Sequence, residues 1–112
     1  MKKFTSNPSL PDPSSSYPTP AMKKLFEAVL LLKSPDQAAA FFRDLLTIAE
    51  LKEFANRWQV VQLLYEGFTY ETIAKRLMIS TATVTRVAHW LHHGLGGYKA
   101  VADRTFPKSK SK

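Results

Sequence analysis

The chain has no cysteine, few glycines, few acidic residues and no long apolar run. The lack of cysteine excludes disulfides, thiol nucleophiles and thiolate metal sites. No apolar stretch approaches the roughly 20 residues of a membrane-spanning helix, so we expect no membrane partner. The chain has only 9 Asp and Glu residues against 16 Lys and Arg residues, which gives a net charge of +7. This basic balance indicates a polyanionic partner, most often nucleic acid.

The motifs of common enzyme classes are missing as well. The chain contains no Gly-rich phosphate loop and no Gly-x-Ser-x-Gly elbow, and its few carboxylates fall mostly on predicted caps and exposed helix faces. We therefore do not expect an enzyme. The first residues carry charge without the apolar segment of a secretory signal, and the lack of cysteine fits a reducing compartment. We expect a cytoplasmic protein of bacterial type, associated with the nucleoid.

The two ends differ in composition from the middle. Residues 1–20 hold five of the seven prolines together with several serines, which predicts a disordered Pro/Ser-rich tail. Residues 107–112 form a short basic tail. Residues 21–106 carry the periodic apolar pattern and are expected to form one helical domain. The net charge is +1 in 1–20, +3 in 21–106 and +3 in 107–112, so the folded part is only mildly basic.

The pattern of residues 21–106 predicts an all-α fold of five helices and a short sixth after residues 96–97. Apolar residues recur at three- and four-residue spacing, and no window shows convincing strand alternation. Gly67 is placed to end the longest helix. Start signals precede three of the helices: Thr19-Pro20, Ser34 with Gln37, and Thr47 with Glu50.

Residues 69–93 have the spacing of a helix-turn-helix. A short helix over 70–77, capped by Thr69, is followed by a break and by a second helix that reaches His93. Ala74 is small where the two helices cross. The expected core positions are Ile73, Leu77, Val84 and Val87.

The turn of this motif contains Met78 where glycine is common. One backbone position of such a turn tends to have a positive φ, which glycine adopts freely. A methionine in that conformation costs on the order of 1 kcal/mol. The sequence therefore predicts either a different turn or a turn that tolerates this strain.

The start of the second helix is the predicted DNA-reading surface. In a helix-turn-helix, this segment enters the major groove and its first residues reach the base edges. Hydroxyls both donate and accept hydrogen bonds, and methyl groups can contact thymine. The predicted base-reading residues are Ser80, Thr81, Ala82 and Thr85. The predicted phosphate-contacting residues are Thr69, Lys75, Arg76 and Arg86.

The segment Ser80-Thr-Ala-Thr-Val-Thr-Arg86 resembles the recognition helix of the Trp repressor superfamily. The resemblance extends back through 57–67 and 45–47 and forward through 96–99 and 103–104, and it fits the Trp-repressor-like YerC/YecD branch. It implies an all-α, intertwined homodimer. It also implies a repressor-like transcriptional regulator that binds double-stranded DNA at a palindromic operator.

The resemblance also raises the question of a tryptophan corepressor. In tryptophan-binding members, two arginines sandwich the indole ring, with Leu and Thr side chains nearby. The matching positions here are Leu46, Thr47, Arg57, Thr83 and Arg86. However, Val87 replaces a glycine and Trp90 replaces a serine, so these larger side chains would fill the space of the indole. We therefore expect no cofactor, and no tryptophan in particular, with Trp90 occupying the site from within.

The same residues have simpler interpretations. Arg57 can pair with Glu53 or Glu50 on its own helix, and Arg86 can contact a phosphate. His89 and His93 have the spacing of a metal clip, but no carboxylate or thiolate lies beside them in sequence, so no metal site is predicted. The aromatic residues Phe26, Phe41, Phe42, Phe54 and Trp58 are expected in a dimer core.

Two other functions fit the pattern. The helix-turn-helix could mediate contact with a protein in a helical dimer that does not bind DNA. Association with RNA, or association of the sigma-factor type, is the third possibility. The salt dependence of binding to a mixed-sequence duplex separates these alternatives, because only phosphate contacts make affinity fall steeply with salt.

Overall fold

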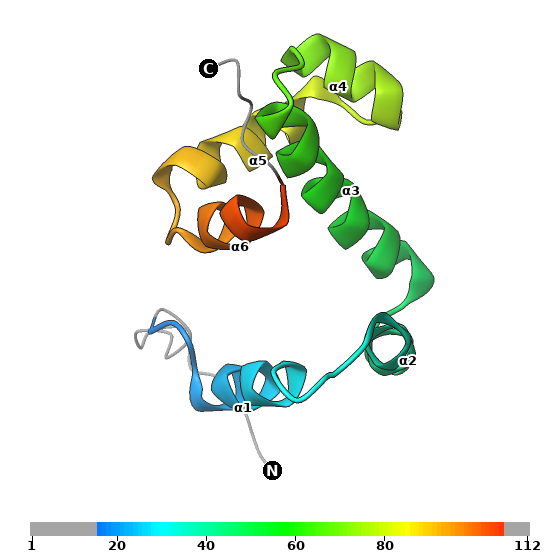
Figure 1. The fold of residues 1–112 in the computed structure, drawn as a ribbon, viewed down its shortest axis with the longest axis vertical. Helices are drawn as coiled ribbons and strands as arrows, with labels where there is room; N and C mark the ends of the chain where they lie inside the picture. Colours follow the sequence, from blue (N-terminus) through cyan, green and yellow to red (C-terminus); the bar gives the residue numbers. More distant parts are fainter. Residues whose placement is uncertain (1–15, 107–112) are drawn as a thin grey trace, which may run out of the picture. The chain divides into compact units, whose positions relative to one another are not determined.

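The computed structural model describes residues 16–106, and these contain six α-helices and no strand (Figure 1). The helices are α1 (Pro20–Val29), α2 (Pro35–Leu45), α3 (Ile48–Tyr65), α4 (Tyr70–Leu77), α5 (Thr81–His93) and α6 (Gly97–Thr105). The all-α prediction is confirmed. Among these helices, none has the length and apolarity needed to cross a bilayer. Most of the predicted N-terminal tail and all of the basic C-terminal tail lie outside the described residues.

Hydroxyl caps determine where five of the helices begin. Thr47 and Glu50 form a complete capping box, in which the Thr47 hydroxyl accepts from the Glu50 N–H and the Glu50 carboxylate accepts from the Thr47 N–H. The predicted box at α2 differs, because the Gln37 side chain accepts from the Lys33 N–H, one residue before the Ser34 cap. The other capping hydroxyls belong to Thr19, Thr69 and Ser80.

The described residues divide into two compact units at Leu45–Leu46. In the second unit, α3 is contacted by α4, α5 and α6. Ile73, Val84 and Val87 are buried in its core, as predicted, and Leu77 is half-buried against them. The core also includes Val60 and Leu63 of α3. Because three helices cover the C-terminal half of α3, apolar side chains are buried on more than one of its faces.

Aromatic contacts and one hydrogen bond attach α6 to α3. The Trp58 ring centroid lies 5.2 Å from that of Phe106 and 6.2 Å from that of Tyr98. The Tyr65 hydroxyl donates to Asp103 Oδ1 over 2.9 Å. Trp58, which the sequence placed in a dimer core, therefore packs within its own chain.

The ends of α3 and α4 share one hydrogen-bond pattern. At α3, the N–H groups of Gly67 and Phe68 donate to the carbonyls of Leu64 and Leu63. At α4, Met78 and Ile79 make the equivalent bonds to Lys75 and Ala74. This motif needs a left-handed residue, and Gly67 (φ 90°) and Met78 (φ 57°, ψ 48°) occupy that position. The turn thus has the conformation that favours glycine, and the fold tolerates methionine there.

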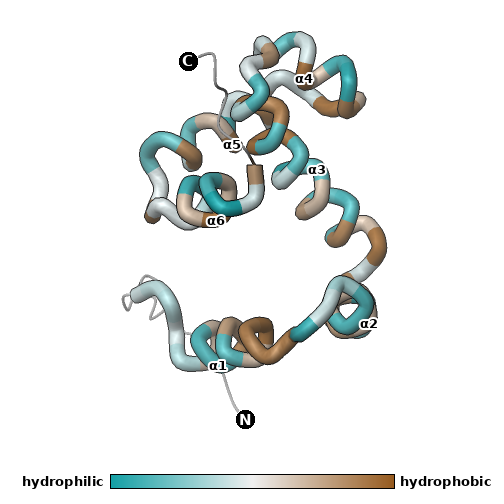
Figure 2. The backbone as a smooth tube through the Cα atoms, viewed as in Figure 1, coloured by the Kyte–Doolittle hydropathy of each residue, from teal (hydrophilic) through white to brown (hydrophobic). Residues whose placement is uncertain are grey.

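The described helices of the first unit have apolar surface but no buried residue. Neither α1 nor α2 buries a residue, although both helices are amphipathic. Leu30 and Leu31, at the end of α1, are 82% and 73% exposed. Figure 2 shows the hydrophobic colour concentrated at this end of α1.

Substitution of Met78 by glycine should stabilise the protein. The Met78 side chain is 89% exposed and therefore loses little packing on removal. Relief of the left-handed strain outweighs the extra chain entropy of glycine, so the free energy of unfolding should rise by about 0.5–1 kcal/mol. Urea unfolding measures this change, with Met78→Ala as the control that keeps the strain. Equal midpoints for the two variants would contradict the argument.

The pair between Tyr65 and Asp103 should make stability sensitive to alkaline pH. Burial raises the pKa of the Tyr65 hydroxyl, and the hydrogen bond to Asp103 and the charge of that carboxylate raise it further. A raised folded-state pKa contributes stability that is complete below about pH 10 and is lost as pH rises through the folded value.

Tyr65→Phe should therefore unfold at a lower urea concentration than the unsubstituted chain at neutral pH. The difference should narrow above about pH 10. Tyr70→Phe is the matched control, since the Tyr70 hydroxyl makes no hydrogen bond to another described residue. A difference that stays constant over the alkaline range would refute the role of this pair.

Candidate nucleic-acid interface

The packing of α4 and α5 fixes the orientation of the first turns of α5. α4 and α5 pack against each other and against α3. Val84 and Val87 bury one face of α5, so the opposite face of its first turns is turned outward. Thr81, Ala82 and Thr85 are exposed there, as the sequence predicts. A rigid core under an exposed first turn is the arrangement by which a helix-turn-helix presents side chains to base edges.

The hydroxyls predicted to contact DNA fall into two groups: some make no hydrogen bond within residues 16–106, and the others cap a helix. Within the described part of the chain, the hydroxyls of Thr81 and Thr85 make no hydrogen bond, so both remain available to a ligand. The Ser80 hydroxyl accepts from the Thr83 N–H over 3.1 Å and lies 3.1 Å from the Thr83 hydroxyl. The Thr69 hydroxyl caps α4 in the same way. Ser80 and Thr69 thus use their side chains mainly to set where the helices begin.

Three exposed cations flank this surface. Lys75 and Arg86 make no ion pair with another described residue. Arg76 lies over the ring of Phe68, with its guanidinium carbon 4.7 Å from the ring centroid. This cation–π contact restricts the arginine while leaving its charge unneutralised. No local pattern in the sequence marks Phe68 as the partner of Arg76, because the two residues lie eight positions apart across a helix start.

The residues that match the family's ligand pocket have other partners here. Arg57 pairs with Glu53 at 2.6 Å. The sequence predicted this ion pair within one helix as the alternative to a role in ligand binding. Thr47 caps α3, and Thr83 contacts Ser80. The cavity beside Arg57 is lined by Phe54, Trp58 and Tyr98, and it includes none of the other four predicted positions.

Val87 and Trp90, the two bulky residues that were expected to fill the family's ligand pocket, lie in different environments. Val87 is part of the buried core, whereas Trp90 is 53% exposed. The Trp90 ring lies 4.9 Å from the ring of His89. The rings of His89 and His93 are 5.1 Å apart. Among residues 16–106, no group of three or more His, Asp or Glu side chains is arranged to hold a metal ion.

The chain is similar to known proteins of one family. The Trp repressor protein family matches residues 21–105. The uncharacterized protein YerC of Bacillus subtilis is 39% identical over 83 residues, which is 74% of this chain and 80% of that protein.

Two solved structures share the fold. The crystal structure of a TrpR-like protein from Eubacterium eligens superposes with a TM-score of 0.78 at 38% identity, covering 86% of this chain and 99% of the other. A second structure, from Staphylococcus aureus, has a TM-score of 0.75 at 34% identity, with 81% and 91% covered. The chain therefore belongs to the Trp repressor family, in its YerC-like group.

Proposed function

We propose that this protein is a sequence-specific DNA-binding transcriptional regulator of the repressor type, which binds a palindromic operator through α4 and α5. The observation that carries the proposal is the exposed first turn of α5, where the hydroxyls of Thr81 and Thr85 make no hydrogen bond to any residue of 16–106. The cations Lys75, Arg76 and Arg86 flank this turn, and none of them pairs with an acidic residue in that part of the chain. Hydroxyl and methyl groups suit base edges, and the cations suit phosphates.

We also propose that the regulator is a homodimer. The first unit exposes apolar side chains that a monomer would leave in water, including Phe26, Leu30 and Leu31. In the second unit, Ile48 and Phe54 are exposed on the N-terminal half of α3. Patches of this kind mark interaction surfaces. A second copy would place two recognition helices about one DNA turn apart, which matches a palindromic site.

Tryptophan is not proposed as a corepressor. Val87 stands where tryptophan-binding members have glycine, and it is buried in the core of this chain. Arg57 is engaged by Glu53. The proposed regulator has no cofactor and no bound metal.

The DNA-binding proposal predicts distinct effects of two substitutions. Arg86→Ala should weaken binding to every duplex and reduce the slope of log K against log salt by about 1, because one phosphate contact is lost. Thr85→Val should change sequence preference, since the hydroxyl is lost while the shape of the side chain is kept. Fluorescence anisotropy with operator candidates selected from random duplexes measures both effects. Tryptophan added to the titrations should leave all affinities unchanged.

The matched control is Lys52→Ala, which removes an exposed cation from α3 outside the motif. This variant should bind like the unsubstituted chain. If no duplex binds at low salt, the surface is not a DNA interface, and the protein-contact alternative stands. If Thr85→Val keeps the original preference, the recognition surface lies elsewhere.

The dimer proposal predicts that one charge on the apolar face of α1 dissociates the protein. Phe26→Glu should shift the sedimentation mass at micromolar concentration from dimer to monomer, since an unpaired carboxylate is costly to bury. Lys24→Glu places the same carboxylate on the polar face of α1, with a larger change in net charge, and should leave the dimer intact. A monomer mass for the unsubstituted chain would refute the proposal.

A further inference from the structure

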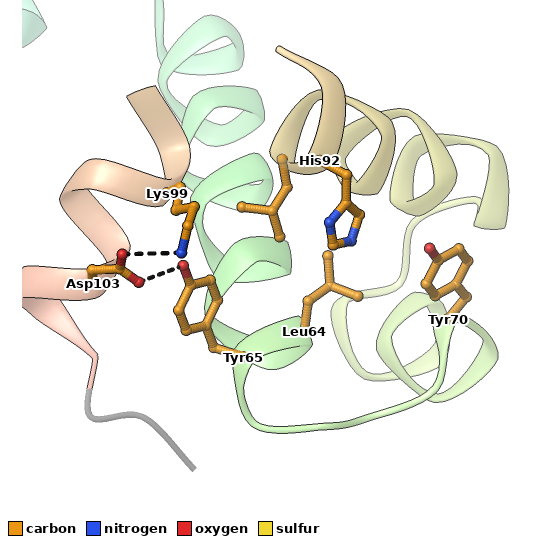
Figure 3. Close-up of a pocket in the computed structure, with 7 residues that line it drawn as sticks. Leu64, Tyr65, Tyr70, His92, Lys99 and Asp103 are labelled. Carbon is orange, nitrogen blue, oxygen red and sulfur yellow. Dashed lines mark hydrogen bonds and ion pairs between the residues drawn. The ribbon is translucent and has the colours of Figure 1, made fainter. Parts of the chain in front are cut away.

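A cavity lies at the far end of α5 from the residues proposed to read DNA. It has a volume of about 390 Å³, and helices α3, α4, α5 and α6 all contribute to its wall (Figure 3). Volumes of this size are typical of sites for small molecules. The lining residues are Leu64, Tyr65, Tyr70, Leu91, His92, Lys99 and Asp103.

The polar groups of this cavity lie at two ends, with leucine between them. In Figure 3, Lys99, Asp103 and Tyr65 lie on one side, His92 and Tyr70 lie on the other, and Leu64 lies in the middle. This distribution suits a short molecule whose apolar body covers the leucines and whose polar groups reach both ends.

The carboxylate of the cavity is already occupied. Asp103 Oδ1 accepts from the Tyr65 hydroxyl over 2.9 Å, and Oδ2 accepts from Lys99 Nζ over 3.2 Å. Its charge is therefore balanced within the chain. A bound amine would have to displace one of these donors and would also face the Lys99 ammonium.

The wall keeps unused hydrogen-bond donors next to the ion pair of Lys99 and Asp103. The Lys99 ammonium has three N–H groups, of which Asp103 takes one. Neither the imidazole of His92 nor the hydroxyl of Tyr70 makes a hydrogen bond to another described residue. We propose that this cavity binds a small carboxylate with an apolar body, with its carboxylate at Lys99 and a second polar group near His92 and Tyr70.

Binding of such a molecule would connect four helices at once. Lys99 belongs to α6, His92 to the last turn of α5, Tyr70 to the start of α4 and Leu64 to the end of α3. A ligand that binds only the folded chain raises its apparent stability by mass action. Binding should therefore be visible as a higher melting temperature, whether or not the chain binds DNA.

The test uses the full chain without DNA and 4-hydroxyphenylacetate as the probe. Calorimetry should detect binding, the melting temperature should rise, and the ring resonances of His92 should shift in NMR spectra. Tyramine has the same phenol and an amine in place of the carboxylate, and it should bind about tenfold more weakly or worse.

Substitutions in the cavity wall test whether the carboxylate of the probe binds Lys99. Lys99→Met should weaken 4-hydroxyphenylacetate about tenfold or more, because a charge-assisted hydrogen bond is lost. Lys52→Met, which removes an exposed lysine outside the cavity, should have no effect. Circular dichroism confirms that both variants are folded. Absence of binding at millimolar probe, equal binding of tyramine, or unchanged affinity of Lys99→Met would each overturn the proposal.

Discussion

The packing of α4 and α5 against the C-terminal half of α3 is the interaction on which the rest of the structure depends. Ile73, Val84 and Val60 are completely buried there, and Ala74 allows the two short helices to approach closely. α4 has only eight residues and is too short to be stable alone. Its position, and therefore the orientation of the first turn of α5, is maintained by this small apolar core. The proposed recognition surface is the exposed side of the same packing unit.

The distribution of charge refines what the composition suggested. The excess of 16 basic over 9 acidic residues lies largely in the two ends of the chain. In the motif, the position of each cation matters more than the number of cations. Arg76 is restrained by Phe68, whereas Lys75 and Arg86 remain unpaired within residues 16–106. A surface of this kind can combine general attraction to phosphates with discrimination by the hydroxyls between them.

The two ends of α5 have different chemistry. Its first turn carries free hydroxyls and methyl groups, and its last turn contributes His92 and Leu91 to the cavity. A 13-residue helix separates these ends by roughly 20 Å. Lys99 and Asp103, in the cavity wall, belong to the helix that aromatic residues attach to α3. The unit thus contains a candidate macromolecular surface and a candidate small-molecule site that share α4 and α5 and have no residue in common.

Local signals in the sequence determined much of this structure. The left-handed conformation of Met78 was one of the two turns that the sequence left open. The caps at Thr19, Thr47 and Thr69 and the outward face of Thr81 and Thr85 depend on hydrogen bonds and periodicity within a few residues. These features could be predicted because the groups that interact are neighbours in the chain.

Tertiary structure alone decided which contacts join distant segments. The burial of Val60 and Leu63 requires three helices around α3, and the pair between Tyr65 and Asp103 joins residues 38 positions apart. No local pattern marks such a pair, because its geometry is created only when α6 packs against α3. The cavity at His92 and Lys99 was invisible in the sequence for the same reason, since its wall is assembled from four separate helices.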